Sequence, residues 1–475
     1  MSAMSGLAAM GVYVPHRRLP AAEIEAAWGT SAPVDRAAVP AADEDALTMA
    51  VAAGREALTD WDRDPTAVTQ LAVATTTPPL AEEEFAPRIV SALGLPSDVR
   101  TETATQSTAA GAEALLAGAS ADGPALVIVA DAPGGDAAEA GQRVGAGAAS
   151  FLFDGDGDAT LLDSTHRSRD APGIRFRERA SESVTGLDIT TYERETMREL
   201  VSTAVEELSI DHEAVDAASL YQPTGDIPHR IAGALPYNGA AIERGTVVDD
   251  VGDAGAATTA IGLVAALAGS EPGALTVAGF FGSGSSAVGL AFETVTEISA
   301  DLAADVESGE SVEYTAALRE RGTVGKADVA GGGAHVSLPS WQRTIPQRYR
   351  LEAGRCPECD AVAFPPEGAC PECHERVEFE VEPLSRTGEV VAVTVIGQGG
   401  APPEFVELQR RDGPFAVAIL EVPTAGESEG TARFPAQLTG SDSTAVSVGD
   451  RVTGRLRRIY SVEGVTRYGL KFVPR

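Results

Sequence analysis

Cysteine, lysine and aromatic residues are all scarce in this chain. Its 475 residues include four cysteines and 5% aromatics, and Lys326 and Lys471 are its only lysines. No segment comes near the roughly eighteen consecutive apolar residues that a membrane span needs. The N-terminal stretch MSAMSGLAAMGVYVP lacks the basic region, apolar stretch and cleavage site of a secretory signal. We therefore predict a cytoplasmic protein with no membrane partner.

Acidic residues dominate the charge. The formal net charge is -34, from 70 Asp and Glu against 36 Lys and Arg. A surface of this kind repels nucleic acid and anionic lipid. Strongly acidic chains are often disordered, but 44% apolar content with clear periodic segments predicts a folded protein. Acid excess with lysine depletion is typical of a halophilic protein, in which salt screens the self-repulsion.

Residues 1–295 alternate between helical and β-rich segments. Ala, Leu, Val and Met recur at helical spacing in the first kind, and several of these segments end at Gly. We predict helices over 45–58, 84–94, 109–119, 192–208 and 256–269. We predict buried strands, bounded by Gly, Pro or Asp, over 70–77, 125–131, 145–154, 218–223 and 275–284. This alternation predicts a layered α/β domain with a largely internal sheet.

The composition changes after Phe292. A charged helical stretch leads into a Gly-rich run, and we assign 296–340 to a helix and linker. Residues 341–380 hold all four cysteines, and 381–475 form the last domain. That domain has alternating strand candidates at 388–396, 414–422, 431–438, 450–460 and 464–473. With no helix predicted among them, they indicate a small closed or partly closed barrel.

The cysteines form a metal-binding pattern. Cys356 and Cys359 make one Cys-x-x-Cys pair, and Cys370 and Cys373 make a second. Two thiolate pairs on tight turns close a tetrahedron around Zn²⁺, with Zn–S distances of about 2.3 Å. His374 adjoins Cys373 and is an alternative ligand, but four sulfurs already fill the coordination shell, so we predict a structural zinc bound by the four cysteines. Two local disulfides or a redox pair are the alternative.

This part of the chain resembles a known family. A short amphipathic helix, a linker with Trp341, the four-cysteine ribbon and a barrel ending in RYGLKF are similar to DUF35 proteins, over 311–475. The resemblance implies a rubredoxin-like zinc ribbon followed by a five-stranded OB-fold β-barrel. Members of this family are partners of thiolase-fold enzymes in acyl-CoA metabolism. It therefore implies docking to a thiolase subunit, of the acetyl-CoA acetyltransferase type, and handling of acyl-CoA.

Basic residues gather on the last two predicted strands. They are Arg451, Arg455, Arg457, Arg458, Arg467 and Lys471. Alternation along a strand places some of them on one face. We assign Arg455, Arg457 and Arg458 to binding of the phosphates of coenzyme A. An ordinary solvated barrel surface is the alternative.

The first 295 residues resemble 3-hydroxy-3-methylglutaryl-CoA (HMG-CoA) synthases of the archaeal type, which have the thiolase fold. The matching pieces span the domain in order and are GVYVPHRRL, DEDALTMAVAAGREAL, ATTTPPL, TAAGAEAL, GAGAASFLF, YQPTGDIPHRIAGAL, VGDAGAATTAIGLVAAL and FFGSGSSA. The resemblance implies an α/β thiolase-like fold of two duplicated βαβαβ halves, normally as a dimer. It also implies a cysteine nucleophile, an acid/base glutamate and a histidine.

The matching positions hold other residues. The family's cysteine falls on Thr108, its glutamate on Thr76, its histidine on Tyr221 and the asparagine of its Gly-Asn turn on Asp253. All four cysteines lie in the ribbon, so thiol catalysis is excluded in this domain. What remains is the loop of Gly282, Ser283 and Gly284, which matches the family's Gly-rich loop and which we assign to CoA binding.

Three hypotheses about function follow. The first is a pseudoenzyme, acting as a scaffold or acyl-CoA-handling subunit in a homodimer or hetero-oligomer beside an active thiolase. The second is an active acyltransferase, similar to HMG-CoA synthase or ketoacyl synthase III, that uses Thr108 or Asp253. The third is an OB-fold that binds nucleic acid through Tyr460, Tyr468 and Phe472, against which the net charge argues.

Two further patterns suggest weaker sites. His229 follows Tyr221 by eight residues and is a candidate base, although surface or capping histidines are commoner. Asp154, Asp156 and Asp158 have calcium-loop spacing, but the Gly and the final Glu of such a loop are missing. We interpret DGDGDATLLDST as a solvated acidic turn.

Overall fold

The computed structural model describes residues 5–187, 190–299, 306, 308–324, 337–397, 405–426, 428–440, 443–462 and 464–475. The chain divides into two compact units, Met1–Pro40 with Asp45–Arg321 and Ala41–Glu44 with Gly322–Arg475. Most of the predicted linker, 325–336, and part of the charged helical stretch before it lie outside the described residues. The finer division into domains 1–295, 296–340, 341–380 and 381–475 stays a prediction.

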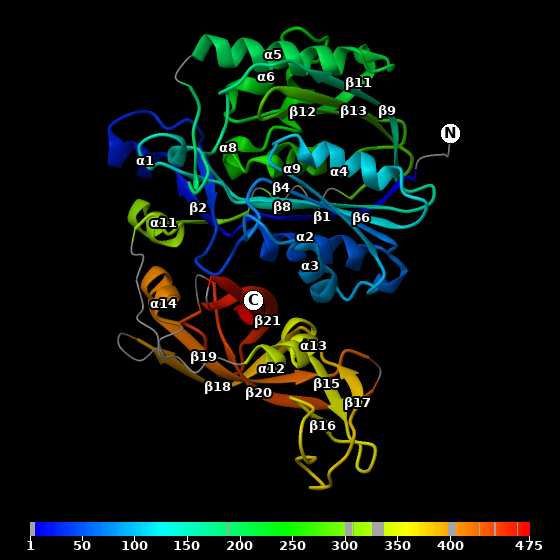
Figure 1. The fold of residues 1–475 in the computed structure, drawn as a ribbon, viewed down its shortest axis with the longest axis vertical. Helices are drawn as coiled ribbons and strands as arrows, with labels where there is room; N and C mark the ends of the chain where they lie inside the picture. Colours follow the sequence, from blue (N-terminus) through cyan, green and yellow to red (C-terminus); the bar gives the residue numbers. More distant parts are fainter. Residues whose placement is uncertain are drawn as a thin grey trace. The chain divides into compact units, whose positions relative to one another are not determined.

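A nine-stranded sheet organises the first unit (Figure 1). In spatial order its strands are β11 (Val215–Leu220), β12 (Leu275–Gly282), β13 (Ser286–Thr294), β9 (Ala159–Ser168), β1 (Leu7–Tyr13), β8 (Gly147–Phe153), β6 (Ala125–Asp131), β4 (Gln70–Thr75) and β5 (Arg100–Thr105). β4 is parallel to both β5 and β6, and β11 is parallel to β12. β1 and β9 share a single pair, Leu7 with Ala159, so the sheet consists of two halves.

Helices cover both halves of the sheet. α4 (Ala110–Ala119) and α9 (Ala256–Leu267) pack against strands of both halves. α2 (Ala46–Asp60) packs on β1, β8 and β6 and contacts α3 (Ala86–Leu93), and α5 (Thr190–Glu206) packs on β9, β12 and β13. The result is five layers, α/β/α/β/α (Figure 1). The structure confirms the predicted layered α/β fold, including its five predicted helices.

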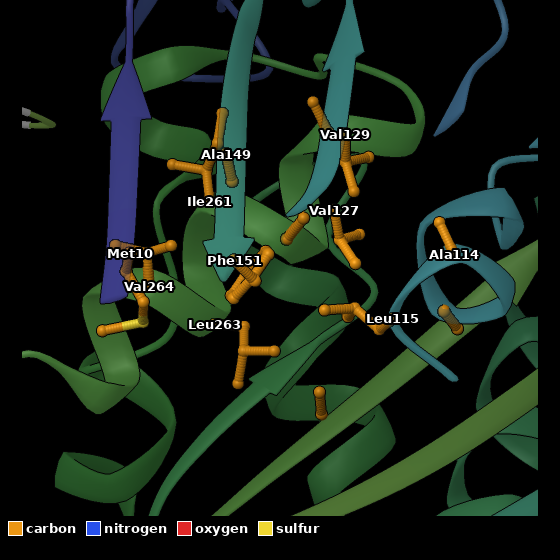
Figure 2. Close-up of a cluster of buried hydrophobic side chains, with 14 of the residues drawn as sticks. Met10, Ala114, Leu115, Val127, Val129, Ala149, Phe151, Ile261, Leu263 and Val264 are labelled. Atoms are coloured by element: carbon orange, nitrogen blue, oxygen red, sulfur yellow. The ribbon is translucent and has the colours of Figure 1, made fainter. Parts of the chain in front are cut away.

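The sequence explains the placement of the central helix. In α9, AATTAIGLVAAL, small and aliphatic side chains point in every direction, and eleven of the twelve residues are buried. A helix that is apolar all round belongs in a core. Figure 2 shows Ile261, Leu263 and Val264 of α9 with Phe151 of β8 and Leu115 of α4 in this cluster. By contrast, α2 is amphipathic and starts with a capping box between Asp45 and Thr48.

Short elements complete the first unit. They are α1 (Ala21–Trp28), β2 (Arg17–Pro20), β3 (Arg36–Val39), β7 (Gly134–Gly135), β10 (Ser183–Val184), α6 (Asp226–Ala232), α7 (Gly239–Glu243), α8 (Val248–Val251), β14 (Glu310–Ser311) and α11 (Tyr314–Glu320). β14, β2 and β3 form a three-stranded sheet. In the described residues, no helix has the length and apolarity needed to cross a membrane.

The second unit contains a ribbon and a barrel. α12 (Leu338–Arg343) and α13 (Ile345–Arg350) precede a small sheet of β16 (Val362–Ala363), β15 (Glu352–Arg355) and β17 (Glu380–Pro383). A second sheet follows, in the order β20 (Thr431–Gln437), β19 (Phe415–Pro423), β18 (Thr387–Ile396), β21 (Arg451–Val462) and β22 (Val465–Pro474). A bridge from Leu438, just after β20, to Phe472 of β22 brings its edges together. The predicted five-stranded barrel is confirmed, nearly closed.

Several elements differ from those predicted, including β1 and β5, two strands of the large sheet that were not predicted from the sequence. α14 (Val406–Asp412) lies within the barrel domain, where no helix was predicted. The acidic run is a turn only as far as Asp158, and from Ala159 it forms the strand β9. β13 was also missed, although its residues are buried at seven of nine positions. β9 pairs with β1 and β13, both distant in the sequence, and such pairing leaves no local signal. β13 pairs with β9 and also forms a hairpin with its sequence neighbour β12.

Candidate functional site

The four cysteines converge on one point. Each offers its sulfur, and the four Sγ atoms lie within 4.8 Å of one another. The Sγ of Cys356 is 3.8 Å from that of Cys373, and the Sγ of Cys359 is 3.5 Å from that of Cys370. Tetrahedral Zn–S bonds of about 2.3 Å require S···S edges of about 3.8 Å. The sulfurs are too far apart for disulfide bonds of about 2.05 Å. The donor set and its spacing therefore fit Zn²⁺.

Two turns of identical sequence present these sulfurs. Both read Cys-Pro-Glu-Cys, and in each the residue after the second cysteine adopts left-handed backbone, with φ 64° at Asp360 and 62° at His374. The N–H of Asp360 donates to the carbonyl of Cys356 at 2.9 Å, and that of His374 to the carbonyl of Cys370 at 3.0 Å. The side chain of His374 is exposed and is not part of the sulfur cluster. Four sulfurs leave no open position, which makes the site structural.

Thr108, at the family's cysteine position, is held by the Gly-rich loop. Its Oγ1 donates to the carbonyl of Phe281 at 2.6 Å and accepts from the N–H of Ser283 at 3.2 Å. Thr108 is buried, and its Oγ1 lies 3.4 Å from the Oγ of Ser283. The structure thus brings Thr108 to the predicted loop. Because the hydroxyl proton points to a carbonyl rather than to a base, Thr108 is not activated as a nucleophile.

Thr76, at the family's glutamate position, is bonded to a buried carboxylate. Its Oγ1 donates to Oδ2 of Asp131 at 2.6 Å. Asp131 ends β6, is fully buried, and also accepts from the hydroxyls of Thr75 and Thr77 and from the N–H of Ala256, which begins α9. Asp131 therefore ties two strand ends to a helix start. Asp131 was not predicted as a site residue, although a carboxylate at the end of a buried strand is a pattern that the sequence shows.

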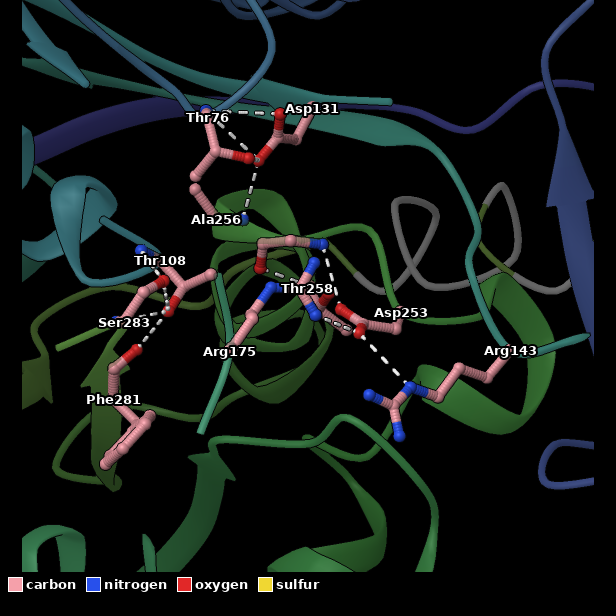
Figure 3. A network of polar contacts seen from close by, with 11 residues as sticks. Thr76, Thr108, Asp131, Arg143, Arg175, Asp253, Ala256, Thr258, Phe281 and Ser283 are labelled. Carbon is pink, nitrogen blue, oxygen red and sulfur yellow. Dashed lines mark hydrogen bonds and ion pairs between the residues drawn. The ribbon is translucent and has the colours of Figure 1, made fainter. Parts of the chain in front are cut away.

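Asp253, at the family's asparagine position, forms a buried ion pair. Its Oδ2 pairs with Nη1 of Arg175, and their side chains are 2% and 6% exposed. Arg143 approaches the same oxygen at 3.8 Å, and the N–H of Gly255 donates to Oδ1 at 3.1 Å. Figure 3 shows the side chain of Arg175 reaching toward Asp253 from the side on which Thr108 and Ser283 lie. Burial alone would lower the pKa of Arg175, but the carboxylate of Asp253 outweighs it and the pKa is raised.

Tyr221, at the family's histidine position, is buried beside Phe281, with ring centroids 5.1 Å apart. Burial raises the pKa of Tyr221 to about 12, although Arg175 opposes the shift. A phenol with this pKa is not a useful base near neutral pH. His229 lies exposed on α6 and is not placed to replace it.

The backbone of the Gly-rich loop is formed as a tight turn between β12 and β13. Gly284 and Ser285 have φ of 92° and 78°, a region that favours glycine. A Cβ on Gly282 would lie 2.3 Å from the Oγ of Ser286 and 2.7 Å from that of Ser107, so a larger residue there would require both serine side chains to move. The role of Gly282, Ser283 and Gly284 in CoA binding stays a prediction.

The predicted basic face of the barrel is partly buried. Arg457 is 6% and Lys471 1% exposed, and both pair with acidic residues of the segment 41–44, which belongs to this unit. Lys471 Nζ lies 2.8 Å from Oδ2 of Asp43, and Arg457 Nη2 lies 2.8 Å from Oε1 of Glu44. The guanidinium of Arg457 is therefore already paired with carboxylates inside the protein, and its assignment to a CoA phosphate stays a prediction. Arg455 is exposed and Arg458 partly buried, and their assignment stays a prediction.

Burial by itself would raise the pKa of Asp43, but Lys471 and Arg457 outweigh it and hold that pKa below its usual value. The hydroxyl of Thr439 also donates to Asp43, at 2.8 Å. No sequence signal links residue 43 to residues more than 390 positions away.

Different known proteins match the two parts of the chain. Residues 343–380 match the family model described as "ChsH2, rubredoxin-like zinc ribbon domain". A DUF35 domain-containing scaffold protein of Methanothermobacter thermautotrophicus is 33% identical over 141 residues, which are 29% of this chain and 96% of the relative. The hydroxymethylglutaryl-CoA synthase of Methanopyrus kandleri is 27% identical over 311 residues, 62% of this chain and 88% of that enzyme.

Solved structures show the fold of the first unit. A crystal structure of HMG-CoA synthase complexed with CoA aligns with a TM-score of 0.61 at 15% identity, over 70% of this chain and 94% of that one. The 3-oxoacyl-(acyl carrier protein) synthase III of Pseudomonas aeruginosa aligns with a TM-score of 0.54 at 18% identity, over 62% of this chain and 99% of that one. The molecule is a thiolase-fold domain joined to a zinc ribbon and barrel. The chain belongs to the DUF35 domain-containing family, and its N-terminal part is an HMG-CoA synthase-like domain.

Proposed function

We propose that this chain is a non-catalytic fusion protein, acting as a scaffold or acyl-CoA-handling subunit in a complex with a thiolase of the acetyl-CoA acetyltransferase type. The observation that carries this proposal is the buried Arg175–Asp253 ion pair at the family's asparagine position. Asp253 is the only carboxylate that the sequence offered as a replacement acid/base, and this ion pair engages it.

The other family positions support the proposal. Thr108 donates to a carbonyl, Thr76 donates to Asp131, and the pKa of Tyr221 is raised to about 12. No thiol, carboxylate or imidazole thus stands at the positions where acyl transfer needs a nucleophile and a base. Each replacement forms an internal bond instead.

The relatives support the class of pathway and the scaffold role. One group of relatives is named hydroxymethylglutaryl-CoA synthase, and another is named a DUF35 domain-containing scaffold protein. A structural neighbour was solved with CoA bound. We therefore propose acyl-CoA metabolism as the setting, CoA or acyl-CoA as the ligand, zinc as the structural metal and the cytoplasm as the location.

The catalytic question is tested with radiolabelled acetyl-CoA. We expect the purified protein to take up no covalent label and to form no product from acetyl-CoA with acetoacetyl-CoA. Covalent labelling that disappears in Thr108→Ala would contradict the proposal and support an active acyltransferase. Turnover lost in Asp253→Asn but kept in Thr108→Ala would contradict it in favour of acid/base work by Asp253.

The scaffold role is tested by isolating a tagged copy of the chain from its native host. We expect a thiolase to co-purify, identified by mass spectrometry, and the complex to elute as one species whose mass exceeds that of the 48.8 kDa chain. Light scattering distinguishes a homodimer from a hetero-oligomer. Elution of the chain without any thiolase, at several salt concentrations, would refute the partner assignment.

A further inference from the structure

The second unit holds a cluster of arginine and aromatic side chains around Trp341, and its CoA-binding arm rests on the proposed function. Trp341 of α12 is 3% exposed, and the guanidinium carbons of Arg348 and Arg467 lie 4.2 and 5.5 Å from the centroid of its ring. Arg348 belongs to α13 and Arg467 to β22. Three elements thus bring two cations to one tryptophan.

Aromatic contacts hold this cluster in place. The ring of Tyr460 meets that of Trp341 edge-on, with centroids 6.1 Å apart, and Phe405 meets Tyr460 edge-on at 6.0 Å. Edge-to-face pairs fix the orientation of both rings. The ring of Trp341 attracts each guanidinium through its quadrupole. The packed aromatic rings therefore restrict the two arginine side chains, which are less mobile than those of exposed surface arginines.

The two cations lack carboxylate partners. Arg348 donates from Nε to Oγ1 of Thr344 at 2.7 Å, which leaves its two terminal nitrogens without a hydrogen bond inside the described chain. The Nε of Arg467 is buried and has no hydrogen-bond partner among the described residues. Neither arginine forms an ion pair within that part of the protein.

Two more arginines extend the positive charge. Phe405 directly precedes α14, which carries Arg411, and Tyr460 is two residues after Arg458 on β21. Burial lowers the pKa of Arg411, and the like charge of Arg458 lowers it further. Burial also lowers the pKa of Arg348. Arg411 has Glu407 at 3.7 Å, so the excess charge is centred on the Trp341 pair. A bound anion would stabilise the charged forms of these arginines.

We propose that Arg348 and Arg467, held against Trp341, bind the phosphate group of a ligand. Two guanidiniums carry a charge of +2, which matches the dianion of a phosphate monoester, whereas a carboxylate neutralises only one of them. The planar guanidinium also donates two parallel hydrogen bonds to phosphate oxygens. Inorganic phosphate and the 3′-phosphate of CoA present the same chemistry. This site does not depend on whether the chain is catalytic.

The experiment is calorimetric titration of the full-length protein at fixed ionic strength with inorganic phosphate, CoA and dephospho-CoA, which lacks the 3′-phosphate. We expect saturable binding of at least one of them. The double variant Arg348→Gln/Arg467→Gln should bind at least about tenfold more weakly, since it removes two charge-assisted contacts. Arg433→Gln is the matched control, because Arg433 lies in the same unit, exposed and paired with Glu421, and should bind as the wild type does.

The pattern of affinities identifies the source of the phosphate. If CoA binds tighter than dephospho-CoA in the wild type and equally in the double variant, the site holds the 3′-phosphate of CoA. If inorganic phosphate binds and the two CoA forms do not differ, the site holds free phosphate. Both results support the proposal. Absence of saturable binding by all three, or an unchanged affinity in the double variant, overturns it.

Two further measurements distinguish a loss of phosphate binding from a loss of folding. Arg348→Lys and Arg467→Lys keep the charge but lose the planar fork, and should have intermediate affinity with an unchanged melting temperature. In a Trp28→Phe/Trp61→Phe background, Trp341 is the only tryptophan. Its emission should change as phosphate binds. Binding that leaves this emission unchanged would place the phosphate elsewhere and overturn the proposal.

Discussion

The two units keep their family chemistry to different degrees. In the second unit the four cysteines are present and their sulfurs lie within 4.8 Å of one another. In the first unit Thr76, Thr108 and Asp253, which the resemblance matches to the family's functional positions, are each bonded to a neighbour. A small ribbon depends on its metal ligands for folding, whereas a large layered domain buries enough apolar surface to fold without a metal.

Metal removal should give the largest effect, confined to the second unit. Chelation, or Cys370→Ser, should cost on the order of 10 kcal/mol of stability there, because zinc binding is coupled to the folding of ribbon domains. Hydrogen exchange measured before and after chelation should accelerate over β15–β17 and leave α9 unchanged. Metal analysis should find one zinc per chain. The control is His374→Ala, which should keep the zinc, and a Cys370→Ser protein with full zinc content would break the comparison.

Asp43→Asn should destabilise the protein by about 5 kcal/mol at pH 7, at the upper end for a broken buried pair, because two cations lose their partner. The folded pKa of Asp43 is lowered, so its stabilisation is present above the unfolded value of about 3.9 and is lost as pH falls through the folded value. Denaturant unfolding at several pH values should show this acid-dependent loss in the wild type and a smaller one in the variant.

The matched control for Asp43 is Glu421→Gln, which removes an exposed ion pair with Arg433 and should cost under about 1 kcal/mol. If both variants lost the same small amount of stability, Asp43 would not be acting as a buried counter-ion. Asp43→Asn/Lys471→Met should recover part of the loss, since one unpaired cation is removed with its partner.

Asp253→Asn should cost about 3 kcal/mol, because Arg175 is left buried with a neutral partner. The combined change Arg175→Met/Asp253→Leu should restore much of the stability, as an apolar replacement of both charges removes their desolvation cost. Thermal unfolding of the three proteins measures the effect. A fully stable Asp253→Asn protein would indicate that the site is open and solvated, and would weaken the distinction between the two units.

Thr108→Cys should give the smallest effect, under about 1 kcal/mol in stability, since sulfur replaces a buried hydroxyl at one hydrogen bond. The variant should still fail to transfer an acetyl group, because Thr76 and Tyr221 supply neither acid nor base. Acetyl transfer is measured with labelled acetyl-CoA, and the wild type is the control. Turnover by this single variant would mean that only the thiol had been lost, and that the rest of the catalytic site persists.

The sequence predicted most of the architecture. Helical periodicity in segments such as 256–269 and β-rich runs such as 125–131 are local signals, and the structure has α9 and β6 there. It did not predict elements that depart from the local pattern. β9 follows an acidic turn and α14 interrupts a series of strands, and neither stands out from its own residues. Pairing with β1 and β13, both distant in the sequence, decides β9.

By itself, the sequence determined the zinc ligands, the layered fold and the lack of a thiol in the first unit, because spacing, periodicity and composition are local properties. Only the tertiary structure decided that Arg175 pairs with Asp253, that Asp43 neutralises Lys471, and that Arg348 and Arg467 share the ring of Trp341. These partners lie between 7 and 428 residues apart in the sequence. Their charges meet because the chain folds, and burial then sets which of them need a counter-ion.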